Sequence, residues 1–197
     1  MGAFTAISYA VPLAVASGLN LYATVAVLGL CARFDLFELP AQFGAFEHPA
    51  VIVTALVMFA VEFMADKVPW VDSLWDAIHT VIRPLGGAVV AVSALGEASP
   101  LAEALIALLG GSVALTAHVG KASTRAAANA SPEPFSNWAL SLAEDVVAVG
   151  LTYAALQHPY LALALALIVL GAMVAFASVV IRFIRHRVRP APRTARV

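Results

Sequence analysis

Acidic side chains inside apolar stretches are the feature of this sequence that could do chemistry. Glu144 lies about nine residues inside the apolar stretch 135–156, or ~13 Å at the rise of an α-helix. A bare carboxylate is costly at that depth in a membrane, so it needs a cationic partner, a proton or water. Glu62 and His118 lie at shallower depths from the same side of two other apolar stretches. These three side chains could therefore meet in one polar cavity.

The basic side chains near His118 have helical spacing. His118, Lys121 and Arg125 follow at i, i+3 and i+7, and Glu62 and Asp66 stand at i, i+4 on another helix, so each set shares one face. In one interpretation the two cations reach the interface and the carboxylates form structural ion pairs between helices. In the other, the same groups line a water-accessible site for an ion, a proton or a small polar solute. Both interpretations stay open.

A second acidic set lies on one face of a predicted amphipathic helix, 70–82. Asp72, Asp76 and His79 offer oxygen and nitrogen ligands for a divalent metal. A solvated polar face on an interfacial helix explains the same spacing, and the Glu-x-x-His pairs of di-iron bundles are missing. Whether a metal binds is left unknown.

Small and polar residues occur near the middle of the first and fourth apolar stretches. They are Ser17, Gly18, Asn20, Gly110, Gly111 and Ser112. They could unwind both helices and expose backbone carbonyls, as in transporters with discontinuous helices. The alternative is close helix packing through small residues, with Asn20 hydrogen-bonded across the interface.

The elements that position these groups must be membrane helices. Of the 197 residues, 62% are hydrophobic and only 12% are charged, and the mean hydropathy is +0.92. A water-soluble domain of this size could not bury that much apolar surface. The apolar stretches lack the alternation of barrel strands, and a lipid-exposed backbone must satisfy its own hydrogen bonds, so the predicted fold class is all-α.

The stretches predict a polytopic transmembrane bundle of about six spans. Their ranges are 6–32, 50–68, a third that ends at 95, 101–120, 135–156 and 160–181. The third either extends back through 77–82 or follows a partly re-entrant course. Residues 1–185 form a single transmembrane domain in this prediction, and 186–197 form a basic cytoplasmic tail. Two inverted three-helix repeats are a further hypothesis.

The basic residues indicate the orientation. With six spans, all but one of the 11 basic residues fall on the side of the arginine-rich tail, and Arg33 alone falls on the other. The opposite connections hold acidic residues, namely Asp35, Glu38, Glu47, Glu97 and Glu103. The prediction is a multi-pass protein of the cytoplasmic (inner) membrane with both termini cytoplasmic.

Three segments carry a resemblance to a known family. They are SGLNLYATVAVLGL, VEFMADKVPWVDSLWDAIHTVIRPLGGA and NASPEPFSNWALSLAEDV, about a third of the chain. They resemble a bacterial membrane-protein family catalogued as domain of unknown function 4126. The resemblance implies a shared membrane fold and brings no substrate, cofactor or catalytic residue.

The leading functional hypothesis is a small transporter or channel for an ion or small polar solute. The expected pathway residues are Asn20, Glu62, Asp66, Lys67, Asp72, Asp76, Arg83, His118, Lys121, Arg125, Glu144 and Asp145. The alternative is a non-catalytic membrane scaffold or assembly factor with structural ion pairs. An enzyme acting on lipid headgroups is disfavoured, because no nucleophile or clear metal set accompanies the amphipathic helix. We expect membrane lipids as partners, no nucleic acid and no cofactor, and homo-oligomer formation stays open.

Overall fold

The computed structural model describes residues 2–37, 39, 41–129 and 135–188, and it describes side chains as far as Arg182 except those of residues 41 and 42. The described part is all-α. Its helices are α1 (Ala3–Leu19), α2 (Leu21–Arg33), the short 3-10 helix η1 (Ala41–Phe46), α3 (Pro49–Ala65), α4 (Pro69–Ser93), α5 (Pro100–Asn129), α6 (Phe135–Gln157) and α7 (Pro159–Val188). Glu38 and most of the predicted tail 186–197 lie outside the described residues.

Proline marks where four of these helices begin. Pro49, Pro69, Pro100 and Pro159 are the first residues of α3, α4, α5 and α7. Proline suits the first helical position because its fixed φ is already helical and its missing N–H would have no partner there. The prolines therefore set where the chain turns from one helix into the next.

The first apolar stretch is broken at Asn20. This residue has extended backbone angles, φ −149° and ψ 100°, and its side-chain oxygen accepts the N–H of Ala23, which caps the start of α2. Its own N–H still donates to Ala16 O at the end of α1. One asparagine therefore ends α1 and begins α2.

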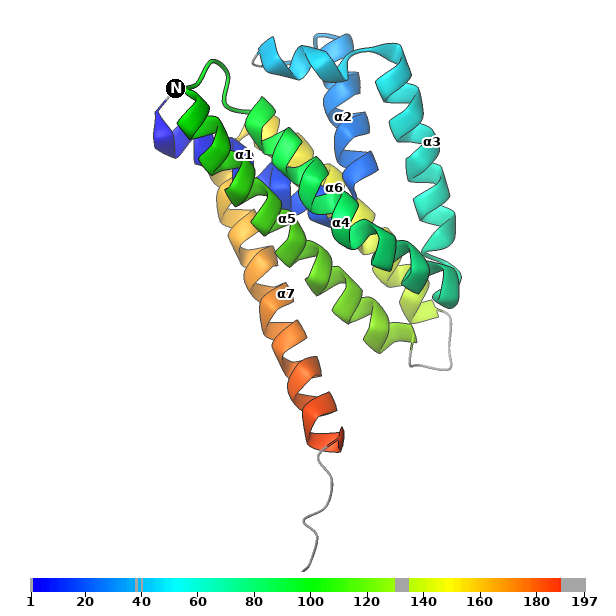
Figure 1. The fold of residues 1–197 in the computed structure, drawn as a ribbon. Coiled ribbons are helices and arrows are strands. Elements are labelled where there is room, and N and C mark those ends of the chain that lie inside the picture. The colour runs from blue at the N-terminus through cyan, green and yellow to red at the C-terminus, as the bar shows by residue number, and fades with distance from the viewer. Residues whose placement is uncertain (1, 38, 40, 130–134, 189–197) are drawn as a thin grey trace, which may run out of the picture.

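The two short helices form a hairpin. Phe4 stacks on Tyr160 at the start of α7, whereas Asn20 bonds Asp145 in the middle of α6. From there α2 runs back along α6, since Thr24 and Phe37 meet Thr152 and Tyr153. Both ends of the hairpin thus lie at the same end of the bundle, and Figure 1 shows this course.

The hairpin corrects one prediction. The stretch 6–32 is not one span, because Asn20 interrupts it. The common side for both termini stays a prediction; α1 begins beside Tyr160, at the start of α7, and α7 continues from there to the other end of the bundle (Figure 1).

Helix α1 forms the centre of the bundle. It packs against α4, α5, α6 and α7, and its residues from Ala10 to Leu19 are all buried. The close approach of α1 to α5 depends on Gly18. A Cβ added there would clash with the carbonyl oxygen of Ala114 and lie 2.7 Å from Ala117 Cβ. Small residues on both helices let the backbones meet.

The fourth apolar stretch is not unwound. Helix α5 is continuous through Gly110, Gly111 and Ser112, and a Cβ on Gly110 would clash with Ala91 of α4. These glycines serve close packing of α5 on α4, so of the two interpretations of this segment close packing is the one confirmed, and a second discontinuous helix is not found. The inverted repeat stays a prediction.

Helix α4 joins two predicted elements. The amphipathic helix 70–82 and the third apolar stretch form one helix of 25 residues that continues through Pro84. The re-entrant alternative for this stretch is therefore wrong, and the extension through 77–82 is what occurs.

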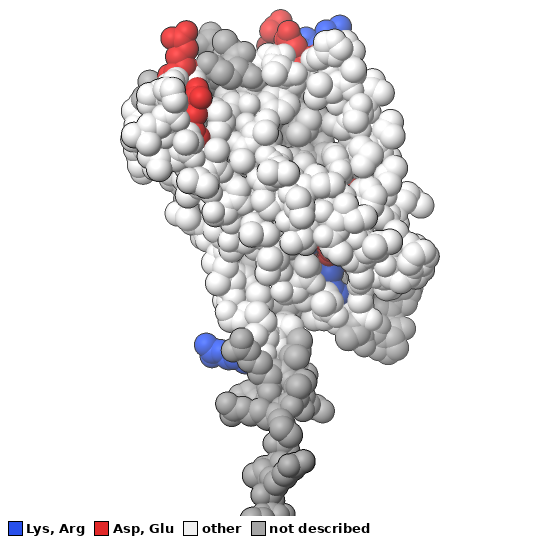
Figure 2. All heavy atoms as spheres, in the orientation of Figure 1, with Lys and Arg blue, Asp and Glu red and all other residues white. Residues whose placement is uncertain are grey.

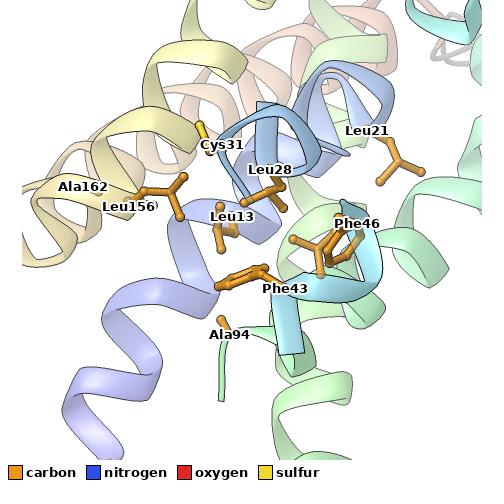
Figure 3. Packing of buried hydrophobic residues seen from close by; sticks show 11 residues of the cluster. Leu13, Leu21, Leu28, Cys31, Phe43, Phe46, Ala94, Leu156 and Ala162 are labelled. Atoms are coloured by element: carbon orange, nitrogen blue, oxygen red, sulfur yellow. The ribbon is translucent and has the colours of Figure 1, made fainter. Parts of the chain in front are cut away.

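The open side of the hairpin is closed by η1. Phe43 is fully buried and Phe46 nearly so, and both point toward Leu13 and Leu28 of the hairpin (Figure 3). Burying two phenylalanine rings stabilises this connection by roughly 3–6 kcal/mol, an upper estimate from area alone. The two rings therefore hold η1 against the hairpin.

The outer surface is suited to lipid. Within the described residues, α5, α6 and α7 as far as Arg182 are long and apolar enough to cross a membrane, and α1, α2 and α3 are apolar but shorter. Figure 2 shows a broad surface with almost no charged atoms between one end, where mostly acidic groups and a few basic atoms gather, and the other end, where mostly basic groups lie. Six spans are not confirmed; the described part is an all-helical fold with three helices that could cross a membrane, which is compatible with a membrane protein.

Candidate functional site

The end of α3 meets α4 and α5 in a set of buried ion pairs. Arg83 Nη2 donates to Glu62 Oε1 at 2.6 Å, and Lys121 Nζ donates to the same oxygen at 3.1 Å. All three side chains are fully buried. Charges removed from water in this way need close partners, and each here has at least one.

Arg125 extends the pairing to α6. Its Nη2 donates to Asp66 Oδ2 at 2.6 Å and its Nε to Glu144 Oε2 at 3.0 Å. Its Nη1 donates to Asn137 Oδ1 at 2.8 Å and to the backbone oxygen of Asp66 at 3.0 Å. Lys121 also lies 3.3 Å from Asp66 Oδ2 and 3.7 Å from Glu144 Oε2. We call these residues, with Glu62 and Arg83, the buried charge cluster.

The tip of the hairpin enters this cluster. Arg83 Nη1 donates to Gly18 O at 3.0 Å, and Lys121 Nζ donates to Leu19 O at 3.1 Å. The last carbonyls of a helix have no partner in the helix and carry its partial negative charge, so cations stabilise them. Beside them, Asn20 Nδ2 donates to Asp145 Oδ1 at 2.8 Å. Distant helices therefore satisfy the Asn20 amide nitrogen and two carbonyls at the break, while the Asn20 side-chain oxygen caps α2 locally.

His118 holds the Arg83 guanidinium in position. Arg83 Nη1 lies 2.8 Å from His118 Nδ1, and His118 Nε2 lies 3.0 Å from the backbone oxygen of Asp76. A guanidinium only donates and a carbonyl only accepts. His118 Nδ1 must therefore be the unprotonated nitrogen, which makes this imidazole neutral and fixes its tautomer.

Acidic groups outnumber basic groups in this region. Among the described residues, six carboxylates are buried with only three buried Lys or Arg side chains, which are Arg83, Lys121 and Arg125. The six are Glu62, Asp66, Asp72, Asp76, Glu144 and Asp145. Each has one oxygen without a hydrogen-bond partner in the described part of the chain. The side chains therefore do not neutralise one another.

A pocket of about 290 Å³ adjoins the cluster between the start of α4 and the end of α5. Asp72, Asp76, Thr80, Arg125 and Asn129 line it with small residues. Arg125 belongs to both the pocket and the cluster, so the pocket leads to the buried charges.

Metal binding receives no support from the described residues. They contain no group of three or more His, Cys, Asp or Glu side chains that could hold a metal ion. His79, proposed with Asp72 and Asp76, instead contacts Tyr22 Oη at 3.0 Å and the backbone oxygen of Trp75 at 2.8 Å. The hypothesis of a metal on this face is not carried further.

The structure brings together eleven of the twelve expected pathway residues, in the cluster, the pocket or the hairpin tip; the exception is Lys67. Lys67 lies after α3, where its Nζ donates to Phe63 O at 3.0 Å and sits 3.2 Å from the centre of the Phe63 ring. No role in the cluster follows from its contacts.

Sequence reasoning missed polar side chains that complete the site. Asn137 Nδ2 donates to the backbone oxygen of Asp66 at 3.1 Å, and Ser141 Oγ to Asp66 Oδ2 at 3.4 Å. Asn137 and Ser141 precede Glu144 by seven and three residues, which is one face of a helix. That spacing is a signal that could have found them.

Comparison with known proteins gives one result. The sequence profile described as domain of unknown function (DUF4126) matches residues 7–179. No curated protein and no solved structure matches the chain.

Proposed function

This chain belongs to the DUF4126 family, and on that premise we propose that it is a membrane transporter or channel for an ion or small polar solute. The observation that carries the proposal is the imbalance of the buried groups: six carboxylates against three cations, each carboxylate with an unpartnered oxygen. Burying unpaired charge is costly, so protons, a cation or water must complete the site. The proposed activity is binding and translocation, without enzymatic chemistry.

The α1–α2 hairpin supports the proposal. Transporter sites are commonly built where a discontinuous helix exposes backbone carbonyls to a polar cavity near mid-membrane. Here the broken helix presents Gly18 and Leu19 carbonyls to Arg83 and Lys121. Movement of either cation would free these carbonyls for a passing solute.

We propose an orientation in the cytoplasmic membrane from the two ends of the bundle. The end where α7 finishes carries Arg182, and five further arginines follow it in the sequence, which favours the cytoplasm. The opposite end carries Glu47, Glu97 and Glu103. The cluster then lies in the inner half of the bilayer, and the start of α1 faces outward.

A scaffold or assembly factor is the second candidate, and the ion pairs favour it. Seven contacts of 4 Å or less between oppositely charged groups join α3, α4, α5 and α6 in the described residues. Such a network could serve to fix four helices in one arrangement. In that case the charges are structural and no solute moves.

Glu144→Gln separates the two candidates, with the exposed Glu103→Gln as the matched control. Purified protein is reconstituted in liposomes, and charge movement is recorded on solid-supported membranes after jumps of pH, sodium, potassium and methylammonium. The transporter proposal predicts a response that is lost in Glu144→Gln while its melting temperature stays near that of the wild type, because the buried carboxylates exceed the cations and the glutamine oxygen can still accept from Arg125. A silent wild type, with a strongly lowered melting temperature for Glu144→Gln, would instead support the scaffold.

A further inference from the structure

Three hydrogen-bond acceptors line the α4–α5 pocket without a partner in the described residues. They are Asp72 Oδ1, Asp76 Oδ1 and Asn129 Oδ1. Asp72 and Asp76 are only 1% and 7% exposed, so bulk water does not freely solvate them. Buried acceptors are normally paired, and three orphans around one pocket indicate a missing donor.

The donors that line the same pocket are already used. Ser73 and Thr80 hydroxyls donate to backbone carbonyls one turn earlier, at 2.9 Å each. Asn129 Nδ2 donates to Asp72 Oδ2 at 2.9 Å, which fixes the orientation of that amide. Arg125 directs its hydrogen bonds into the buried charge cluster and comes only within 3.8 Å of Asp72 Oδ1. The pocket therefore offers acceptors and negative charge.

The pocket wall is apolar beside these acceptors. Ala77, Ala122 and Ala126 have small side chains and border the open space of about 290 Å³. A water molecule occupies ~30 Å³ in the liquid, so the space holds a charged group, a short hydrocarbon chain and a few waters.

We propose that this pocket binds a primary ammonium group, R–NH₃⁺. Such a group has one positive charge, three N–H donors and no acceptor, which matches two carboxylate oxygens and one amide oxygen. A bare metal ion fits less well, because the described residues provide no cluster of three metal-ligating side chains. Naming the cation class rests on the proposed function for transport, but binding can be tested separately.

The ammonium could come from a free amine or from a phosphatidylethanolamine headgroup, since both carry R–NH₃⁺. The full-length protein is therefore placed in phosphatidylcholine nanodiscs, and binding of propylammonium is measured by calorimetry. Tetramethylammonium, which has the charge but no N–H donor, and sodium are the comparison cations at equal ionic strength. Discs that also contain phosphatidylethanolamine form a second arm.

We expect saturable binding of propylammonium and none of tetramethylammonium. Asp76→Asn should weaken binding by roughly tenfold or more, because hydrogen bonds to charged groups contribute about 1.5–3 kcal/mol and 1.4 kcal/mol is tenfold. Ala122→Leu, which fills the pocket and removes no charge, should also abolish binding. It tests the proposal even if Asp76→Asn fails to fold. The exposed Glu97→Gln should bind as the wild type does.

The comparison of discs with and without phosphatidylethanolamine identifies the source of the ammonium group, and both of its outcomes support the proposal. Weaker apparent propylammonium binding in the phosphatidylethanolamine discs assigns the pocket to the headgroup, and unchanged binding assigns it to a free amine. Equal binding of tetramethylammonium, or no loss with Ala122→Leu, would overturn the proposal. Binding of propylammonium without any charge movement would support this inference and contradict the transporter proposal. Transport of another solute without propylammonium binding would contradict this inference and support the transporter proposal.

Discussion

Lys121→Met removes the charge that links most groups of the buried cluster while keeping a side chain of similar length. The Lys121 ammonium contacts Glu62, Asp66 and Glu144 and also donates to the Leu19 carbonyl at the hairpin tip. Removing one partner of a buried ion pair costs about 3–5 kcal/mol. Since 1 kcal/mol shifts the melting temperature of a chain of this size by about 2–4 °C, the loss should be roughly 6–20 °C.

The assay is thermal unfolding in detergent followed by intrinsic tryptophan fluorescence. Lys67→Met is the matched control, because Lys67 forms no ion pair in the described residues and its contact with Phe63 contributes at most about 1 kcal/mol. The control should therefore lose less than about 4 °C.

A double variant tests the reason for the loss. Lys121→Met with Glu62→Gln removes one of the carboxylates that the first substitution leaves uncompensated. Contacting residues are not additive, so the double variant should melt above the single Lys121→Met variant. If Lys121→Met melts like the wild type, or if the double variant loses as much as the sum of the two single variants, the electrostatic reasoning is refuted.

Other predictions concern the packing and course of the first two helices. Gly18→Ala should destabilise the protein by about 1–3 kcal/mol in the same melts, because the new methyl group meets the Ala114 backbone, whereas Gly150→Ala, which has open space, should be neutral or stabilising. Asn20→Ala should cost about 1–3 kcal/mol through loss of the α2 cap and of the bond to Asp145, and an unchanged melting temperature would remove the cap from the account. In a Cys31→Ala background, impermeant thiol reagents should label Ala3→Cys and Arg182→Cys from opposite sides of the membrane; labelling of both from one side would contradict the hairpin.

The sequence was sufficient to predict the all-α class and the convergence of the charged residues. Both follow from the cost that a lipid environment would impose: a backbone in lipid must be helical, and Glu62, His118 and Glu144, predicted in the same half of the bilayer, need polar partners. This reasoning needs only composition and position along each apolar stretch. It could not say whether the pairs are dry or adjoin a pocket.

The course of the first apolar stretch depends on contacts far away in the sequence. Asn20 ends α1 because Asp145, Arg83 and Lys121 satisfy the polar groups of the break. Gly110 looks equally able to break a helix, yet it faces Ala91. There the missing side chain lets α5 approach α4 closely, and the helix stays continuous. Local sequence does not distinguish these two cases, because tertiary contacts decide between them.

The three unpartnered acceptors were also beyond the sequence. Asp72, Asp76 and Asn129 come from two helices, and only their arrangement shows that neighbouring donors are committed elsewhere. Helical spacing gave the shared face of the two aspartates but not the amide that completes the set.

Infrared spectroscopy of carboxyl groups tests the central claim most directly, namely that the buried carboxylates exceed their cationic partners and need an exchangeable species. Reconstituted wild type should show a protonated carboxyl C=O band that changes with pH and falls when propylammonium replaces protons, and Glu144→Gln should alter that band. A spectrum without any buried protonated carboxyl, indifferent to pH and to added cations, would mean that the side chains balance one another and would contradict the account.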